Sequence, residues 1–433
     1  MLFPFANQQR TSGSVSTIAA EPNPLSLAPF AGLLLAIAIL PAVAPGQWHR
    51  HYGKICAAFA AITVPYYIFA LHGAPRVVHA GLEYASFITV VAAFFTVAGG
   101  IHLQPRSPAT PELNTLFLFA GALAANLLGT VGASMLLIRP WIALNRGRFA
   151  GFHLAFFIFV VSNIGGLLLP VGPPLLLGYL KGVPFWWVAR RCWLPWSIAL
   201  GALLSVFYVF DRWNYSRHNE QTASPWKRWR CSGATNFFAM AALLACLVFL
   251  PAGWRECFVV AIAIIAHRFT PPRIRELNEF SLAPLKEIAW IFAGIFATMI
   301  PGLDYMERHA AHLGLRSDAH FFWATGAASA FLDNAPAYLT FLAGALGLHG
   351  LRVENAADVA EFIGRHDHSL IAISLGATCF GALTYIGNGP NLLVKAIADH
   401  AGVEGPGFFT YIFKYGLPIL APILALVSFL FFR

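Results

Sequence analysis

Long apolar segments alternate with short polar stretches along the chain, and twelve of these segments are candidate membrane segments. A helix crosses ~30 Å of hydrocarbon with about 20 residues, so this pattern predicts that most of the chain is membrane-embedded helix. The segments of the first half are 27–45, 55–72, 84–101, 111–142, 152–180 and 193–210. Those of the second half are 236–250, 254–266, 288–303, 321–348, 370–398 and 408–432.

The second half repeats the first, with segment starts about 200 to 218 residues apart. Two interrupted segments carry the clearest match, because GPPLL at 172–176 corresponds to GPNLL at 389–393, an offset of 389 − 172 = 217 residues. Glycine and proline break helices. Paired interrupted segments at corresponding positions of two halves indicate the binding site of a transporter.

The fourth segment of each half, 111–142 or 321–348, is too long for one crossing and too short for two. Each has a polar break near its middle, which predicts a re-entrant hairpin supported by surrounding protein. Each half then has five transmembrane helices, one of them broken, plus one hairpin. Since five is odd, the second half must be inverted, and we predict an all-α integral membrane protein with two inverted repeats.

The same pattern divides the chain into a polar N-terminal tail (1–26), a first repeat (27–210), a basic linker (211–235) and a second repeat (236–433). The basic linker is expected in the cytoplasm, and the acidic loop 351–368 outside, because cytoplasmic loops are rich in lysine and arginine. This orientation places both termini outside. Lys181, Arg190 and Arg191 are exceptions, because they also fall outside.

Composition agrees with a membrane protein, since 58% of residues are hydrophobic, 11% are charged and the mean hydropathy is +0.66. The net charge of +9 comes mainly from basic residues in short loops, where they set orientation, so the expected partner is the lipid bilayer and not nucleic acid. No P-loop, nucleophile elbow or HExxH motif is present. We therefore expect neither an enzyme nor an ATP-driven pump, and no cofactor.

Asp333 is the only one of the 19 acidic residues that we place in the middle of an apolar segment. A carboxylate at membrane depth is costly and indicates a cation or proton path. The alternative is a structural acid that holds the hairpin together. Asn334 and Pro336 favour the functional interpretation, because they open the helix and free carbonyl oxygens that could coordinate a hard cation. In the first half, Ala125 occupies the position of Asp333.

Neutral polar residues near the breaks are further candidates for binding a cation or substrate, although such residues also hydrogen-bond packed helices to one another. They are Asn126, Thr130, Ser162, Asn163, Thr384, Asn388 and Asn391, with Ser134 as a weaker candidate. Lys395 is expected either to pair with Asp333 or to extend toward the membrane interface. The predicted helix-break residues are Gly129, Gly165, Gly166, Pro170, Gly172, Pro173, Pro336, Gly387, Gly389 and Pro390.

Three motifs, SNIGG followed by PVGPP (162–174), FLDNAPA (331–337) and YIGNGPN (385–391), resemble the ion-transporter superfamily of sodium/proton antiporters, arsenite efflux permeases and citrate or divalent-anion symporters. The likeness is greatest to bacterial citrate transporters and sodium/proton antiporters. It implies a homodimer in the bacterial inner membrane. It also implies a scaffold (27–101 and 236–303) and a mobile transport part (107–210 and 317–433), with ion and substrate sites at the hairpin tips and helix breaks.

The resemblance leaves two functions open. The first is a cation/proton antiporter working by alternating access, in which Asp333 alternately binds a proton and Na⁺. The second is a cation- or proton-coupled transporter of citrate or another organic anion, with helix N-termini binding carboxylates. Divalent-anion symporters have Ser-Asn-Thr at both hairpin tips, whereas this chain has Asp333-Asn334 at one tip and Asn126 with Gly129-Thr130 at the other. This departure favours the antiporter. Beyond a transported Na⁺, no metal is expected.

Overall fold

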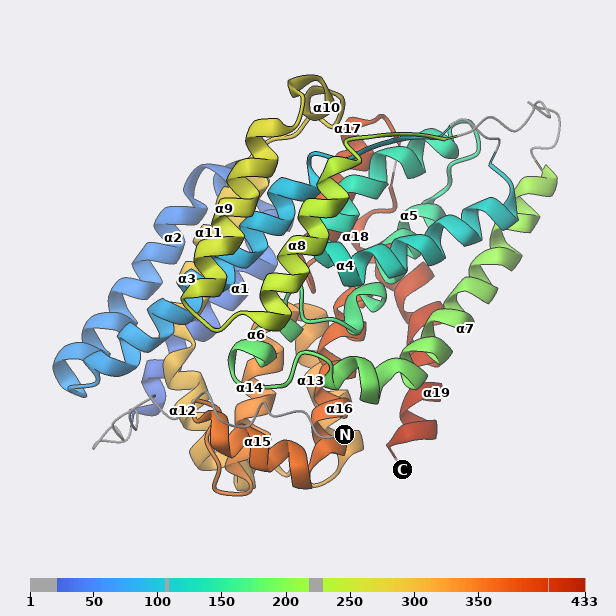
Figure 1. Ribbon diagram of the computed structural model, residues 1–433. Coiled ribbons are helices and arrows are strands. Elements are labelled where there is room, and N and C mark those ends of the chain that lie inside the picture. Colours follow the sequence, from blue (N-terminus) through green and yellow to red (C-terminus); the bar gives the residue numbers. More distant parts are fainter. Residues whose placement is uncertain (1–21, 106–108, 218–228, 404, 433) are drawn as a thin grey trace, which may run out of the picture.

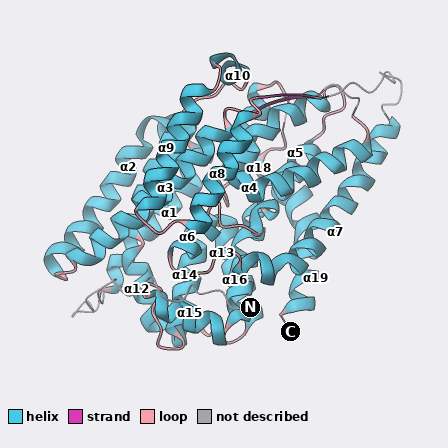
Figure 2. Cartoon of the chain, in the orientation of Figure 1, coloured by secondary structure: helices cyan, strands magenta, loops and turns pink. Residues whose placement is uncertain are grey.

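The computed structural model describes residues 22–105, 109–217, 229–403 and 405–432, and these are almost entirely helical (Figures 1 and 2). The first half contains η1 (Pro24–Leu27), α1 (Ala28–Val43), α2 (Pro45–Pro65), η2 (Tyr66–Ala70), α3 (Ala74–Ala98), α4 (Pro111–Leu144), α5 (Gly151–Val160), η3 (Ile164–Leu167), α6 (Leu175–Leu180) and α7 (Trp187–Arg217). The second half begins with α8 (Thr235–Phe249), α9 (Trp254–Phe269), α10 (Pro272–Leu277), α11 (Ala283–Thr298), α12 (Ile300–His309) and η4 (Ala310–Leu313). It continues with α13 (Asp318–Phe331), α14 (Asn334–Gly347), α15 (Ala356–Arg365), α16 (Asp367–Phe380), η5 (Gly381–Leu383), α17 (Gly389–His400), α18 (Phe408–Tyr411), η6 (Ile412–Leu420) and α19 (Ala421–Phe431).

Six helices among the described residues are long and apolar enough to cross a membrane, or seven if the bent pair α11 and α12 forms one span. This confirms the prediction of an all-α, multi-pass membrane protein. Shorter apolar helices occur where the sequence breaks the helix, as at the ends of α5 and α16. Most of the predicted tail 1–26 lies outside the described residues. So does part of the predicted linker, whose first residues belong to α7 instead.

Two strands that the sequence did not predict connect the halves on one face of the molecule. They are β1 (His102–Gln104) and β2 (Arg230–Ser232), which pair antiparallel with Leu103 opposite Cys231. The strand pair follows α3 and precedes α8, so it ties the end of the first predicted scaffold segment to the start of the second.

Helices from the two halves intermingle in two groups. The first group contains α1, α2, α3, α9 and α11, which lie together on the left of Figure 1; α2 packs on α11, and α3 packs on α9 and α11. In the second group α13 and α14 pack on α16, α4 packs on η3 and α17, and α14 contacts α6. The second group contains both predicted hairpins and both broken helices.

Glycine or an extended residue breaks each predicted hairpin near its middle. Gly129 interrupts α4 with φ 71° and ψ 158°, a conformation that only glycine adopts without strain. In the second half α13 ends at Phe331, Leu332 is extended, and α14 begins at Asn334. Pro336 fits in the first turn of α14 because no intrahelical hydrogen bond is required of its nitrogen there. The breaks therefore follow from local sequence.

Candidate functional site

The two broken helices meet through side chains from both halves of the chain. Asn163 Nδ2 donates a hydrogen bond to Asn391 Oδ1 at 2.8 Å. Asn388 Nδ2 donates to Asn163 Oδ1 at 3.0 Å and to the Ser162 carbonyl oxygen at 2.8 Å. All four residues are buried. The structure thus brings together two pairs of predicted site residues, Ser162 with Asn163 and Asn388 with Asn391, that lie more than 200 positions apart in sequence.

Most of these amide groups hold the broken backbone. Asn391 Nδ2 donates to the carbonyl oxygens of Gly381 and Thr384, each at 2.8 Å, and Asn163 Nδ2 also donates to the Ile158 carbonyl at 2.9 Å. Carbonyl groups near helix ends lack intrahelical partners and need others. The side-chain oxygens of Asn163 and Asn391 each accept a hydrogen bond as well, so both residues connect the broken helices in this structure.

Two further candidates in the first half have similar structural roles. Asn126 Oδ1 accepts hydrogen bonds from the backbone N–H groups of Leu168 at 2.8 Å and Leu169 at 3.3 Å, so it joins α4 to the first break. The hydroxyl groups of Ser134 and Ser162 lie 2.8 Å apart. Both contacts connect the predicted hairpin to the broken helix of its own half.

The second hairpin is attached to the second break by a different set of contacts. Thr384 Oγ1 donates to the Ala330 carbonyl at 2.5 Å and accepts from the Gly387 N–H at 3.0 Å. The Asn334 N–H donates to the Gly387 carbonyl at 3.2 Å. A Cβ atom at Gly387 would lie 2.7 Å from the Ser329 carbonyl oxygen, so only glycine permits this approach.

In the first half, the hairpin tip packs on the break through van der Waals contact. A Cβ atom at Gly129 would lie 3.6 Å from the Val171 carbonyl oxygen, and one at Gly166 would lie 2.5 Å from Thr130 Cγ2. The remaining predicted helix-break residues lie in the turns of the two breaks or in the first turn of a helix: Gly165, Pro170, Gly172, Pro173, Pro336, Gly389 and Pro390.

Polar groups without a partner lie at both hairpin tips. Asn334 is 1% exposed, yet neither its Oδ1 nor its Nδ2 has a hydrogen-bond partner in the described part of the chain. Thr130 Oγ1, at the other tip, is also buried without a partner among these residues. Buried polar groups are nearly always hydrogen-bonded. These two side chains are therefore the best candidates for direct contact with a solute.

Asp333 lies where two helices begin. Its Oδ1 accepts a hydrogen bond from the Ala335 N–H at 3.0 Å and so caps α14, and α17 begins beside it, because the N–H of the adjacent Asn334 donates to the carbonyl of Gly387, two residues before the start of α17. Asn388 precedes α17 without capping it, because its Nδ2 is directed at Ser162 and Asn163. Helix N-termini carry a partial positive charge, so both helices stabilise a negative charge at this position.

Lys395 does not reach Asp333. Its Nζ instead pairs with Asp399 one turn later on α17. The predicted pair between Lys395 and Asp333 is therefore wrong for this structure, since the closer carboxylate on the same helix competes for the ammonium group.

Sequence reasoning missed a buried cluster of charges. Lys181 Nζ lies 2.7 Å from Glu83 Oε2 and 2.6 Å from Glu354 Oε1, while Arg76 lies 2.7 Å from Glu354 and 2.8 Å from Asp304. Burial alone would raise the pKa of Glu354, but the positive charges of Lys181 and Arg76 hold it well below its ordinary value. One feature of the sequence did indicate this cluster. Lys181 departs from the rule that basic residues lie in cytoplasmic loops, and in the structure Glu83 and Glu354 neutralise its charge.

A second buried cluster surrounds Asp211, which contacts Arg148, His153 at 3.0 Å and Asn114 at 2.8 Å. Asp211 and Asp304 are both buried within helices, so Asp333 is not the only acid that the fold removes from solvent, although it remains the one placed in the middle of a predicted apolar segment. The apolar pattern did not identify these acids, because each lies one residue after the end of a predicted apolar segment: Asp211 follows 193–210, and Asp304 follows 288–303. Arg191, another orientation exception, pairs with Asp367 at 3.1 Å.

Comparisons with known proteins agree with the motifs and with the helical fold. A family model described as putative citrate transport matches residues 20–432, nearly the whole chain. Among curated proteins, none matches the chain. The length of the match confirms the predicted resemblance to the citrate-transporter group of the ion-transporter superfamily. The chain therefore belongs to the family of putative citrate transport proteins and is a membrane transporter.

Proposed function

We propose that this protein is a proton-coupled symporter of citrate or a chemically similar organic anion that works by alternating access. The observation that carries this proposal is the position of Asp333 at the N-termini of both α14 and α17. The family description supports the organic-anion function over the sodium/proton antiporter that the sequence alone favoured.

The coupling follows from electrostatics. While Asp333 is ionised, its own carboxylate occupies the positive ends of the two helices and repels a second anion. When Asp333 binds a proton its charge is lost, and the N–H groups at these helix ends favour a substrate carboxylate instead. A proton and an organic anion therefore bind together, and each increases the affinity for the other.

The unpartnered groups at the tips supply the remaining contacts. Asn334 offers both a donor and an acceptor, and Thr130 offers a hydroxyl group. Citrate carries three carboxyl groups and one hydroxyl, which match these groups. Leaving buried polar groups unpaired costs about 1–3 kcal/mol each, so a solute that pairs with them gains that free energy on binding.

The inverted-repeat arrangement belongs to the same proposal. Each hairpin tip contacts the break of its own half, and the two breaks are joined through Asn163, Asn388 and Asn391. We assign 27–101 and 236–303 to the scaffold and 107–210 and 317–433 to the moving part. With Lys181 and Arg191 neutralised by acidic partners, the proposed orientation keeps its basic linker in the cytoplasm. The proposed setting is a homodimer in the bacterial inner membrane.

A sodium/proton antiporter is the second candidate, and Asp333 is the observation that favours it. The carboxylate with the oxygens of Asn334 and Thr130 would provide the hard ligands that Na⁺ prefers. The two helix N-termini at Asp333 oppose a bound cation, so the geometry supports the symporter better.

Proteoliposomes distinguish these functions. For the symporter we expect an inward proton gradient to drive accumulation of labelled citrate, and a proton-sensitive dye inside the vesicles to report acidification on citrate addition. An antiporter would instead give a dye response to Na⁺ without citrate. Dye responses to Na⁺ together with no citrate uptake would overturn the proposal.

A further inference from the structure

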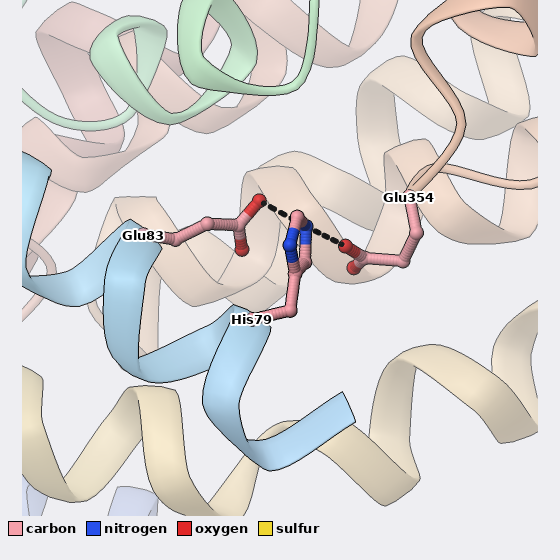
Figure 3. Close-up of side chains that lie close together, drawn as sticks. All are labelled: His79, Glu83 and Glu354. Carbon is pink, nitrogen blue, oxygen red and sulfur yellow. Dashed lines mark ion pairs between the residues drawn. The ribbon is translucent and has the colours of Figure 1, made fainter. Parts of the chain in front are cut away.

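Three metal-ligating side chains converge beside the buried charge cluster, away from Asp333 (Figure 3). His79 and Glu83 are one turn apart on α3, and Glu354 lies in the segment between α14 and α15. His79 Nε2 is 3.3 Å from Glu83 Oε1 and 3.1 Å from Glu354 Oε2, so the imidazole stands between two carboxylates. These atoms all lie within 4.8 Å of one another.

The separations fit a tetrahedral metal better than a hydrogen bond. Ligands about 2.0 Å from Zn²⁺ in a tetrahedron are about 3.3 Å from one another. Charge-assisted hydrogen bonds are shorter, at about 2.7–2.9 Å, and one N–H shared between two carboxylates makes only a longer three-centre contact with each. Glu354 Oε2 is buried, and apart from its ion pair with His79 it has no hydrogen-bond partner among the described residues.

Lys181 and Arg76 orient these carboxylates toward His79. Lys181 binds Glu83 Oε2 and Glu354 Oε1, and Arg76 binds Glu354 Oε1, which leaves Glu83 Oε1 and Glu354 Oε2 directed at the imidazole. Outer hydrogen bonds of this kind commonly hold the ligands of metal sites.

The local charge also favours a cation. Glu83, Glu354 and Asp304 carry three negative charges against the two positive charges of Arg76 and Lys181, so one more positive charge balances the cluster, either a proton on His79 or a cation that replaces this proton. The other charged groups next to the cluster, Glu307 and Arg352, form a pair of opposite sign at 3.7 Å.

The geometry points to a binding site for a divalent transition-metal ion of the Zn²⁺ type, with His79, Glu83 and Glu354 as ligands and water as the fourth. His79 is 36% exposed, which leaves access for the ion and the water. A bound ion would join α3, in the proposed scaffold, to the segment before α15, in the proposed moving part. We infer that Zn²⁺ binding slows transport by holding these parts together, an effect that rests on the proposed function.

Metal binding is measured first and without transport, by titrating Zn²⁺ or Co²⁺ into the purified full chain in detergent. We expect one saturable site per chain, a tetrahedral visible spectrum with Co²⁺, and little competition from Mg²⁺, which prefers octahedral oxygen ligands. His79→Ala should weaken Zn²⁺ binding by more than about 100-fold. Removing a residue that only hydrogen-bonds a metal ligand typically lowers metal affinity by about 10–100-fold, and removing the ligand itself should lower it further. His51→Ala on α2 is the matched histidine control and should bind as the wild type does.

Absence of saturable binding, or an equal affinity in His79→Ala and wild type, would overturn the metal site. If His79→Ala fails to fold, the wild-type Co²⁺ spectrum decides, since an octahedral spectrum contradicts the assigned ligands. In proteoliposomes, Zn²⁺ should slow citrate uptake by the wild type and by His51→Ala but not by His79→Ala. A protein that binds Zn²⁺ but shows no proton-driven uptake of citrate or of similar organic anions would refute the proposed function and leave the metal site intact.

Discussion

Replacing Asp333 by asparagine tests the proposed coupling most directly. Asparagine has nearly the same shape, is also a favourable N-cap residue, and keeps an oxygen that can accept from the Ala335 N–H. Because the cap is kept, we expect Asp333→Asn to change the free energy of unfolding by less than about 1 kcal/mol. The substitution removes only the ionisable group, so the variant permanently resembles the protonated wild type.

The magnitude follows from the number of protons involved. Asp333 is the one carboxylate shared by the N-termini of α14 and α17, so substrate binding is linked to one proton. Above the pKa of that carboxyl in the free protein, the affinity of the wild type for citrate should fall about tenfold per pH unit, or about 1.4 kcal/mol. The affinity of Asp333→Asn should lack this contribution.

Equilibrium binding of labelled citrate to purified protein across a pH series measures the effect. Citrate itself titrates, and the ratio of the wild-type to the Asp333→Asn dissociation constant cancels this contribution. We also expect Asp333→Asn to lose uptake driven by a proton gradient but to retain citrate counterflow. Asp399→Asn, which removes a carboxylate paired with Lys395, is the matched control and should keep proton-driven uptake. A ratio that does not change with pH would refute the coupling through Asp333.

Three further predictions concern the frame of the site and can be measured by thermal and chemical unfolding in detergent. Lys181→Met should destabilise the protein by about 3–5 kcal/mol, because it leaves buried carboxylates without their ammonium partner. Arg190 is exposed, so Arg190→Met should change the free energy of unfolding by less than about 0.5 kcal/mol. Equal effects of the two substitutions would contradict the buried ion pairs. Gly387→Ala should cost about 1–3 kcal/mol because its Cβ would overlap backbone oxygens, while Gly389→Ala has open space, so a tolerated Gly387→Ala would argue against the close contact. Glu354→Gln should be less stable than the wild type above about pH 4.3, because the ion pairs lower the pKa of Glu354 in the folded state. The difference in the free energy of unfolding should shrink only in more acidic solution, where Glu354 of the wild type binds a proton. A difference that grows on acidification would contradict the lowered pKa.

The sequence predicted the helical membrane fold because segment length and apolar composition are local properties. Gly129, Pro336 and the GPP and GPN motifs act on their own backbone, so the breaks were also predictable. Pairing between distant segments is not local. The contacts of Lys181 with Glu83 and Glu354 depend on packing, and nothing near Lys181 in the sequence identifies its partners.

The candidate site was predictable in position but less so in the role of each residue. The motifs indicated that Asn163, Asn388 and Asn391 lie near one another, and the structure places them in contact. Which amide bonds to backbone and which is left without a partner depends on side-chain directions that a sequence does not specify. Asn334 therefore became distinct from the other asparagines only in three dimensions.

The ion pairs of Lys181 also constrain the order in which the protein matures. Glu83 precedes Lys181 by 98 residues and is already synthesised when Lys181 emerges, but Glu354 follows by 173 residues. During biosynthesis Lys181 therefore enters the membrane with at most half of its final charge compensation. The buried lysine therefore reaches its final environment only after the segment before α15 has been synthesised and has folded against it. Assembly of this transporter is consequently completed from its C-terminal half.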